Sequence, residues 1–255
     1  MDNDKIIIAR IEDKLEQCER GSYITTTGFL NMHEQSLAMH IVKGRSDVKS
    51  FFYGGYDDAE RRIILFVPDG YADTLEDVLE MISPLSVLHI KVAPGGRKLT
   101  HRDYLGSVLS LGLDRSVIGD ILVNDKGADM IVNSEIVDFL LAEFNSAGHT
   151  NLQITASDIG ELEVPEQRVK AVRDTLSSPR LDNVVSAAFH VSRSEAVRAI
   201  KGGIVFVNHE EVTKVDKRIN EGDTIVLRGR GKAILSELSG LSKKGRIWVE
   251  FKVFI

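Results

Sequence analysis

The order of hydrophobic periods between residues 85 and 156 limits the folds open to this chain more than any other feature. Residues 85–93 alternate apolar and polar side chains as a strand does, whereas residues 101–112 have helical spacing and end at a glycine. Two strands, a helix and a final strand are predicted to follow over residues 119–124, 129–132, 134–145 and 151–156, and Ser134 is predicted to cap the helix. The resulting order, β-α-β-β-α-β within about 75 residues, is the split βαβ plan.

RNA-recognition motifs share this plan, so the sequence predicts an RNA-recognition-like βαββαβ middle domain over residues 83–158. Such motifs stack bases on exposed aromatic side chains of two central strands. The corresponding strands here, residues 85–93 and 129–132, contain no Phe or Tyr. The plan therefore predicts the fold of the middle domain but not base stacking by it.

A mixed α/β domain is predicted ahead of the middle domain, over residues 1–82. Its expected elements are helices over residues 4–19 and 29–42, strands over residues 48–54 and 62–67, and a short helix capped by Thr74. Residues 159–178 are polar with weak alternation and are interpreted as a linker that contains one strand. With a C-terminal domain over residues 179–255, the chain is predicted to be an α+β protein of three domains.

Charge is divided unevenly along the chain. The whole sequence has 32 Lys and Arg against 38 Asp and Glu, a net charge of −6. Residues 1–179 contain 18 Lys and Arg against 29 Asp and Glu, a difference of −11, whereas residues 180–255 contain 14 against 9, a difference of +5. A basic segment in an acidic chain indicates an anionic partner for that segment.

The sequence offers few means of binding a metal or entering a membrane. Cys18 is the only cysteine, which excludes an intrachain disulfide and a thiolate metal cage, and the seven histidines do not pair at metal-ligand spacing. The N-terminus does not resemble a signal peptide, and no apolar run approaches the roughly 20 residues of a membrane span. We therefore expect a cytoplasmic protein with no cofactor, no metal, no membrane partner and no small-molecule substrate.

The C-terminal segment is predicted to contain two short helices followed by short strands. Residues 181–189 place apolar side chains on one helical face, and the sequence SRSE at residues 192–195 is a capping box that starts a second helix. Lys201 ends this helix, and the glycine pair at residues 202–203 supplies a left-handed cap. Asp182 is interpreted as a cap or an ion-pair partner rather than a catalytic group.

Several ordered motifs in this segment resemble the S4 RNA-binding domain. They are, in chain order, Arg180-Leu181-Asp182, Ser192-Arg193-Ser194-Glu195-Ala196, Ile200-Lys201-Gly202-Gly203-Ile204-Val205-Phe206-Val207-Asn208 and Glu221-Gly222-Asp223. The resemblance implies that the helix pair and its connecting turn form a basic surface that binds structured RNA. The usual Asn-Gly turn of that family is Asn208-His209 here.

The middle of the chain resembles the YlmH family of bacterial S4-domain proteins. The residues that carry this resemblance are His101-Arg102-Asp103-Tyr104-Leu105-Gly106, continuing through Gly112, and Ile118-Gly119-Asp120-Ile121. The resemblance implies a non-enzymatic protein of translation with rRNA and tRNA as partners. It implies binding to the large ribosomal subunit that carries a stalled peptidyl-tRNA, in ribosome-associated quality control.

The residues themselves also favour an RNA-binding surface at the second helix. A helix N-terminus has free backbone N–H groups and a partial positive charge, which suit a phosphate, and an arginine binds phosphate bidentately. Arg198 and Lys201 are three residues apart and share one helix face. The predicted RNA-binding residues are Arg180, Ser192, Arg193, Ser194, Arg198, Lys201, Arg228, Arg230 and Lys232.

Simpler interpretations of these residues involve no ligand. Ser192 caps a helix, which is worth about 1 kcal/mol, and cations at such spacing usually form a solvated face. Arg193 and Lys201 are predicted to face solvent about 12 Å apart, so replacing both with Ala is expected to leave the fold intact. The ordered S4 motifs favour RNA binding over the solvated-face interpretation.

Enzyme motifs are present only in part. Arg180-Leu181-Asp182 is similar to the catalytic triplet of some pseudouridine synthases, in which the triplet lies in a separate large domain. The run His101-Arg102-Asp103 lacks the Asn that a kinase catalytic loop needs five residues after its Asp, since that position is Val108. No catalytic residue is predicted. An RNA-modifying enzyme or its inactive relative, and a protein-interaction adaptor on the ribosome, are the alternative functions.

Overall fold

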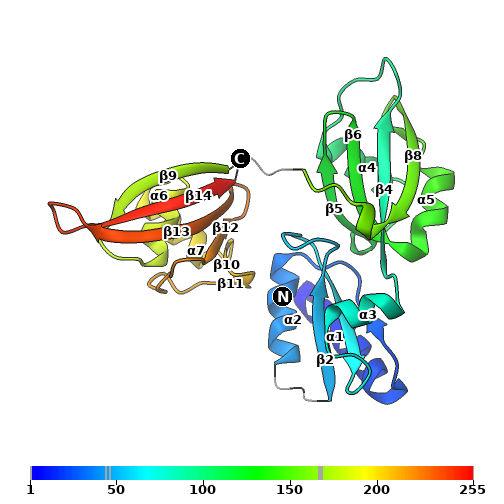
Figure 1. Cartoon of the computed structure of the whole chain (residues 1–255), viewed down its shortest axis with the longest axis horizontal. Helices are drawn as coiled ribbons and strands as arrows, with labels where there is room; N and C mark the ends of the chain where they lie inside the picture. The colour runs from blue at the N-terminus through cyan, green and yellow to red at the C-terminus, as the bar shows by residue number, and fades with distance from the viewer. Residues whose placement is uncertain (1, 44, 46, 166–168, 255) are drawn as a thin grey trace. The chain divides into compact units, whose positions relative to one another are not determined.

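The computed structural model describes residues 2–43, 45, 47–165 and 169–254. The chain divides into two compact units, Met1–Pro165 and Glu166–Ile255 (Figure 1). The strands of the described residues form sheets of three, five and six strands, and helices cover them. The mixed α+β class that the sequence predicts is therefore confirmed. Residues 166–168 of the predicted linker lie outside the described residues.

Two helices pack against a small sheet at the start of the first unit. The elements are α1 (Asp2–Gly21), β1 (Thr25–Thr26), α2 (Met32–Val42), β2 (Val48–Tyr53), β3 (Ile63–Pro68) and α3 (Leu75–Met81), with strand order β1-β3-β2. Ile11 and Leu15 of α1 are buried in one cluster with Phe66 of β3, since the apolar residues of α1 recur at helical spacing. Capping boxes begin α2 at Asn31 and α3 at Thr74, and the cap at Thr74 is as predicted.

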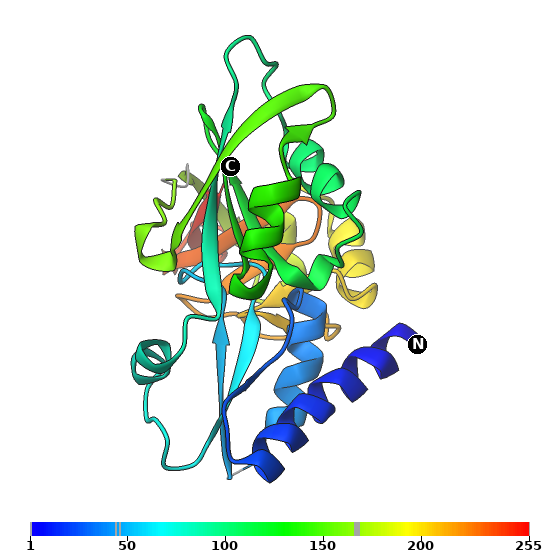
Figure 2. The same ribbon diagram turned by 90° about the vertical axis from the view of Figure 1, so that its right-hand side faces the viewer.

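The elements that follow have the predicted order, with an added two-residue strand. They are β4 (Leu85–Val92), α4 (His101–Leu109), β5 (Ile118–Val123), β6 (Gly127–Asn133), α5 (Val137–Glu143), β7 (Ser146–Ala147) and β8 (Thr150–Asp158), with short 3-10 turns at Arg115–Val117, Ser134–Ile136 and Ile159–Glu161. The antiparallel pairings give the strand order β5-β6-β4-β8-β7. Helices α4 and α5 cover one face of this sheet (Figure 2), where Tyr104 and Leu140 share a buried cluster with Leu88 and Met130.

The opposite face of the five-stranded sheet is partly covered by the N-terminal elements. Ile131 of β6 is fully buried and lies in one apolar cluster with Phe29, Ile63 and Leu65. Asp120 of β5 also accepts hydrogen bonds from the Tyr56 hydroxyl at 2.9 Å and from the backbone N–H of Glu60 at 2.7 Å. These shared contacts explain why residues 1–82 and 83–158 lie in the same unit.

Two helix starts differ from the prediction. The helix expected over residues 29–42 begins at Met32, because Asn31 accepts the hydrogen bond of the Glu34 backbone N–H and thus starts the helix. Ser134 does not cap a helix, since its hydroxyl donates to the carbonyl of Ser83 at 2.7 Å, and α5 begins at Val137.

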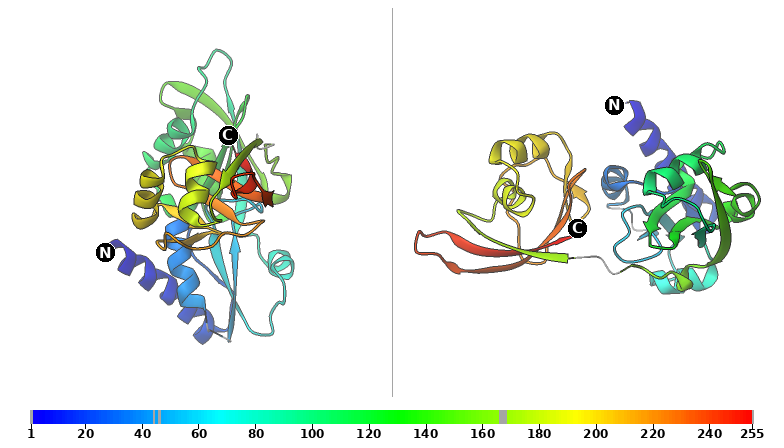
Figure 3. Two further views of the ribbon diagram at one scale, coloured as in Figure 1. Left: turned by 90° about the vertical axis from the view of Figure 1, so that its left-hand side faces the viewer. Right: turned by 90° about the horizontal axis from the view of Figure 1, so that it is seen from above.

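The second unit places two helices on one face of a six-stranded sheet (Figure 3). Its elements are β9 (Val169–Leu176), α6 (Leu181–Ala188), α7 (Arg193–Lys201), β10 (Val205–Val207), β11 (Glu210–Glu211), β12 (Thr224–Leu227), β13 (Gly231–Leu241) and β14 (Ile247–Phe254), in the order β11-β10-β12-β13-β14-β9. Leu181 and Ile200 of the helices are fully buried in the cluster that contains Phe251 of β14. The strand predicted inside the linker is β9, which pairs along its whole length with β14.

The Asn208-His209 turn forms despite the missing glycine. Both residues have positive φ, 51° and 68°, and they join β10 to β11 through the pairing of Val207 with Glu210. A two-residue hairpin with positive φ at both central positions is the turn that Asn-Gly favours. The turn geometry of the S4 motif is therefore kept with His209 in the left-handed region.

Candidate nucleic-acid interface

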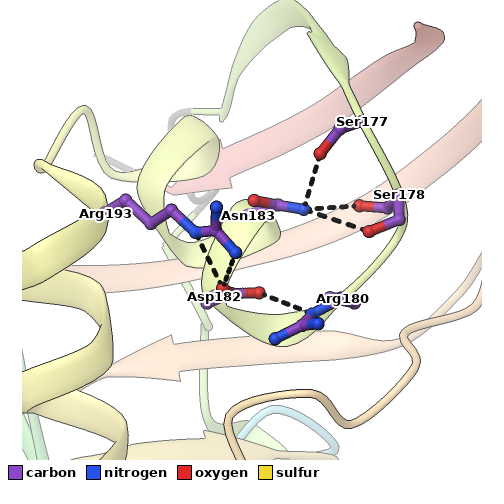
Figure 4. Close-up of polar contacts among 6 residues, drawn as sticks. All are labelled: Ser177, Ser178, Arg180, Asp182, Asn183 and Arg193. Carbon is purple, nitrogen blue, oxygen red and sulfur yellow. Dashed lines mark hydrogen bonds and ion pairs between the residues drawn. The ribbon is translucent and has the colours of Figure 1, made fainter.

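Asp182 is the buried centre of the S4 helix pair. Its side chain is 1% exposed, and it lies in the first turn of α6. One carboxylate oxygen, Oδ2, accepts hydrogen bonds from Nε and Nη2 of Arg193 at 2.9 and 2.7 Å (Figure 4). The other, Oδ1, accepts from Nε of Arg180 at 3.2 Å. A buried carboxylate thus fixes two guanidinium groups from two different helix starts, which agrees with its predicted ion-pair role.

Both arginines remain accessible although they are paired. The side chains of Arg180 and Arg193 are 42% and 62% exposed. Arg193 faces solvent as predicted, but the expectation that its replacement leaves the fold intact is wrong, because its Nε and Nη2 both donate to Oδ2 of the buried Asp182. Removing Arg193 would leave that carboxylate partly unpaired in the interior, which is costly. Double replacement of Arg193 and Lys201 therefore perturbs the fold as well as the surface.

The segment before α6 is fixed by its own hydrogen bonds. The Asn183 side-chain amide donates to the Ser177 hydroxyl at 3.2 Å and to the Ser178 carbonyl at 3.1 Å. The backbone N–H of Leu181 donates to the Lys217 carbonyl at 2.8 Å. Arg180 thus projects from a segment that is tied to α6 and to the loop before β12.

The start of α7 is occupied by its own capping box. The Ser192 hydroxyl accepts from the Glu195 backbone N–H, and the Glu195 carboxylate accepts from the Ser192 backbone N–H at 2.8 Å, as predicted. The Ser192 hydroxyl also donates to the Glu195 carboxylate at 2.7 Å. This hydrogen bond and that from the Ser192 backbone N–H lower the pKa of Glu195, with nearby Arg198 and Arg230 as smaller causes. An anionic carboxylate already lies at this helix N-terminus, so the cations around it are better placed for phosphate than the N-terminus itself. A ligand contact by Ser192 or Ser194 stays a prediction.

Arg198 and Lys201 form the exposed face of α7. Ala196 and Ile200 are fully buried on the other side of the helix. Both cations are exposed, and within the described residues neither forms an ion pair. Their charged groups are therefore accessible to a partner, although Arg198 also lies close enough to Glu195 to lower the pKa of that carboxyl.

The three cations at the turn between β12 and β13 differ in their exposure to solvent. Arg228 and Arg230 are exposed, and Arg230 is near enough to Glu195 to lower its pKa. Lys232 is half-buried, with its ammonium 4.4 Å from the centroid of the Phe254 ring, a cation–π contact. The turn brings Arg230 beside α7, whereas the Lys232 side chain is engaged on the sheet.

Sequence reasoning missed two arrangements. His89 of β4 bridges three strands through Asp129 of β6 at 2.7 Å and Ser157 of β8 at 2.8 Å. Beyond Lys232, the turn between β13 and β14 has three cations within residues 243–246. The sequence KKGR at residues 243–246 could have predicted the basic turn. The contacts of His89 could not be predicted, because they depend on the strand register.

No three His, Cys, Asp or Glu side chains gather as a metal site in the described ranges of the chain. Across those same ranges, no helix has the length and apolar character needed to cross a bilayer.

Comparison with known proteins identifies the family. Residues 3–71, 84–161 and 179–225 match families described as YlmH, N-terminal; putative RNA-binding domain in YlmH; and S4 domain. Over 226 residues the chain is 32% identical to the ribosome-associated protein quality control protein P2 of Bacillus subtilis (strain 168), covering 89% of this chain and 86% of that protein. The chain belongs to the YlmH family.

A solved structure supports the fold of this YlmH-family chain. Cell division protein ylmH from Streptococcus pneumoniae matches with a TM-score of 0.50 and 21% sequence identity, over 62% of this chain and 93% of its own. The S4 match spans Arg180, Asp182 and Arg193 but ends before Arg228. The residues after 225 are therefore judged by their geometry alone.

Proposed function

We propose that this YlmH-family protein binds structured RNA of the ribosome through its S4 domain. The observation that carries the proposal is the buried Asp182, which fixes Arg180 and Arg193 while leaving both guanidinium groups accessible. A guanidinium held in one orientation loses little freedom on binding and takes a phosphate bidentately. Duplex RNA is recognised mainly through phosphates and 2′-hydroxyls, for which a rigid basic surface suffices.

The cellular role follows from the named relative. We propose that the protein binds rRNA and tRNA on the large ribosomal subunit and acts without turnover in ribosome-associated quality control. The name of the Bacillus subtilis relative supports the last part alone, since it describes that protein as ribosome-associated and as a protein of quality control. The burial of Asp182 between two arginines supports a structural rather than a catalytic role for the Arg-Leu-Asp triplet. The order of elements in β4–β8 supports an RNA-recognition-like middle domain, and the family description of that segment names it a putative RNA-binding domain.

Replacing Arg198 and Lys201 with Ala together tests the S4 surface in the full-length protein. Both side chains are exposed, and Ser192 and Asp182 keep their partners, so the melting temperature is expected to stay close to that of the parent. The salt dependence of RNA binding should lose about 1.4 to 1.8 units of slope, 0.7 to 0.9 for each phosphate contact. Affinity for a structured rRNA fragment and cosedimentation with 50S subunits should fall.

The matched control replaces Lys5 and Lys43 with Ala, which removes the same charge from exposed positions of the first unit. This control is expected to bind as the parent does. Unchanged binding and unchanged salt slope for the Arg198/Lys201 variant would refute the S4-centred proposal.

A further inference from the structure

The hairpin formed by β13 and β14 ends in a turn that contains only basic charge. Between Glu237 and Glu250 the sequence has Lys243, Lys244 and Arg246 and no acidic residue. All three cations are exposed, and the hairpin extends past the helix pair of its own unit (Figure 3, right). In a chain of net charge −6, three exposed cations with no acidic residue among them in the turn favour an anionic partner there.

The one tryptophan of the chain lies next to this turn. Trp248 is 49% exposed, and it points away from α6 and α7, since its neighbour Val249 is buried under the helices. Its cross-strand partners are the small polar residues Ser239 and Thr175. A large aromatic side chain with small neighbours on both adjacent strands offers a flat surface on which a planar ligand can stack.

Arg246 joins the basic turn to the aromatic surface. Its Nε donates to the Thr175 hydroxyl at 2.9 Å, and its Nη2 donates to the Thr175 carbonyl. Thr175 is the register partner of Trp248, so the guanidinium is held beside the indole on the same stretch of β9. Aromatic stacking of bases combined with cations for the backbone is how single-stranded nucleic acids are bound without base-specific hydrogen bonds.

The turn is also connected to the S4 surface. Thr175 and Arg180 are five residues apart, which an extended chain spans in at most about 17 Å. The intervening Ser177 and Ser178 are held by Asn183 of α6. The basic turn and Arg180 thus lie within one short stretch of the same domain, with Trp248 on the face of the sheet opposite to the helices.

We propose that Lys243, Lys244, Arg246 and Trp248 form a second RNA contact, in which an unpaired base stacks on the indole and the cations bind the adjacent phosphates. This proposal extends the proposed S4 function and rests on the protein being an RNA binder. Three cations beside an exposed indole with small neighbours together favour RNA over an acidic protein or a lipid surface.

Fluorescence of the full-length protein tests the stacking directly, because Trp248 is its only tryptophan. Titration with an RNA hairpin that has an unpaired loop is expected to quench the emission, whereas heparin, which has charge but no bases, should bind without comparable quenching. Equal quenching by heparin, or none by RNA, would overturn the stacking. Binding of phosphatidylserine vesicles with quenching, in the absence of RNA quenching, would assign the surface to lipid and overturn the proposal.

Three variants test the affinity, measured by anisotropy of labelled RNA. Replacing Lys243 and Lys244 with Ala should reduce the salt slope by about 1.4 to 1.8 units. Trp248→Ala should weaken binding about tenfold, and Trp248→Phe should weaken it less, because Phe still stacks. The Lys5/Lys43 variant is the charge-matched control.

The variants also separate failure of this proposal from failure of the S4 function. If the Arg198/Lys201 variant loses affinity while the hairpin variants bind as the parent does, the hairpin contact is refuted and the S4 function stands. If the hairpin variants lose affinity while the Arg198/Lys201 variant does not, the hairpin contact stands and the S4-centred function fails.

Discussion

The two units use buried arginine interactions in opposite ways. In the first unit, Arg61 donates to the carbonyls of Phe29, Arg115 and Ile118, and burial lowers its pKa. Arg115 donates to the carbonyls of Ile118 and Gly119, and burial together with repulsion from Arg61 lowers its pKa to about 10. In the second unit, a single buried carboxylate holds Arg180 and Arg193.

The groups that accept hydrogen bonds from each arginine determine how much of the guanidinium stays accessible to a binding partner. Three carbonyls from separate segments accept from Nε and Nη2 of Arg61, so the guanidinium connects the loop before α2 to the segment that leads into β5. Asp182 accepts from one edge of each of its arginines and leaves the rest exposed. Two similar groups of cations therefore have different roles, one within the fold and one at a surface.

The largest expected effect is that of Arg61→Ala. It removes one donor from each of three carbonyls and the link that the guanidinium makes between the Phe29 loop and β5, and the first unit should lose about 3 kcal/mol of unfolding free energy. The carbonyl of Ile118 keeps its hydrogen bond from Arg115, and the carbonyl of Arg115 keeps that of the Ile118 backbone N–H. All five tyrosines precede residue 105, so tyrosine absorbance during urea unfolding of the full chain reports this unit. RNA affinity should be unchanged.

Arg20→Ala is the matched control, since Arg20 makes only an exposed pair with Glu16 on α1 and should shift stability by no more than about 0.5 kcal/mol. A loss of RNA affinity in the Arg61 variant at temperatures where it is folded would contradict the contrast between the two units.

A smaller stability effect is expected for Arg193→Ala, together with a binding effect. Asp182 keeps only Arg180, and the second unit should lose about 2 kcal/mol, measured by Trp248 fluorescence during unfolding. RNA affinity should fall as well. Arg193→Lys restores the charge but not the bidentate geometry, so it should recover part of each loss. Parent-like stability of Arg193→Ala would show that Asp182 does not depend on this pair.

Lowering the pH should reduce the unfolding free energy of the first unit more than that of the second. Near neutral pH this effect should be smaller than that of Arg61→Ala or Arg193→Ala. Hydrogen bonds at helix starts lower the pKa values of Asp77, Asp103 and Asp114 in the first unit and of Glu195 in the second; for Asp103 the pair with Arg97 is the largest cause. A carboxyl with a lowered pKa stabilises the folded state above its unfolded pKa, and this stability is lost as pH falls through the folded pKa.

Unfolding measured from pH 7 down to pH 2 should therefore show the tyrosine transition shifting more than the tryptophan transition. Asp103→Asn should reduce that difference. A larger shift of the tryptophan transition than of the tyrosine transition would contradict the stabilising role of these capping carboxylates in the first unit.

Local sequence signals predicted much of this fold because they act within a few residues. Capping boxes at Thr74 and Ser192 form as predicted, and strands β2, β3 and β4 lie within two residues of their predicted bounds. The ion pair of Asp182 with Arg193 joins residues eleven apart across two helices, so helical spacing predicted the exposure of Arg193 but not its partner. Ser134 failed as a cap because a carbonyl fifty-one residues away takes its hydroxyl.

The candidate site was predictable in its residue types but not in its pairing. The cations at Arg198 and Lys201 are exposed as the helical pattern indicates, whereas the contact of Lys232 with Phe254 depends on a sheet register that the sequence does not reveal.

Strand β9 determines where a fragment that contains the S4 domain has to begin. The S4 family match covers residues 179–225, yet β9 forms the outer edge of the sheet and pairs with all eight residues of β14. On β9, the charged residues Lys170, Arg173 and Asp174 discourage pairing with another chain. A fragment that begins at residue 179 would expose the β14 edge, rich in Ile, Val, Trp and Phe, as an unprotected template for aggregation.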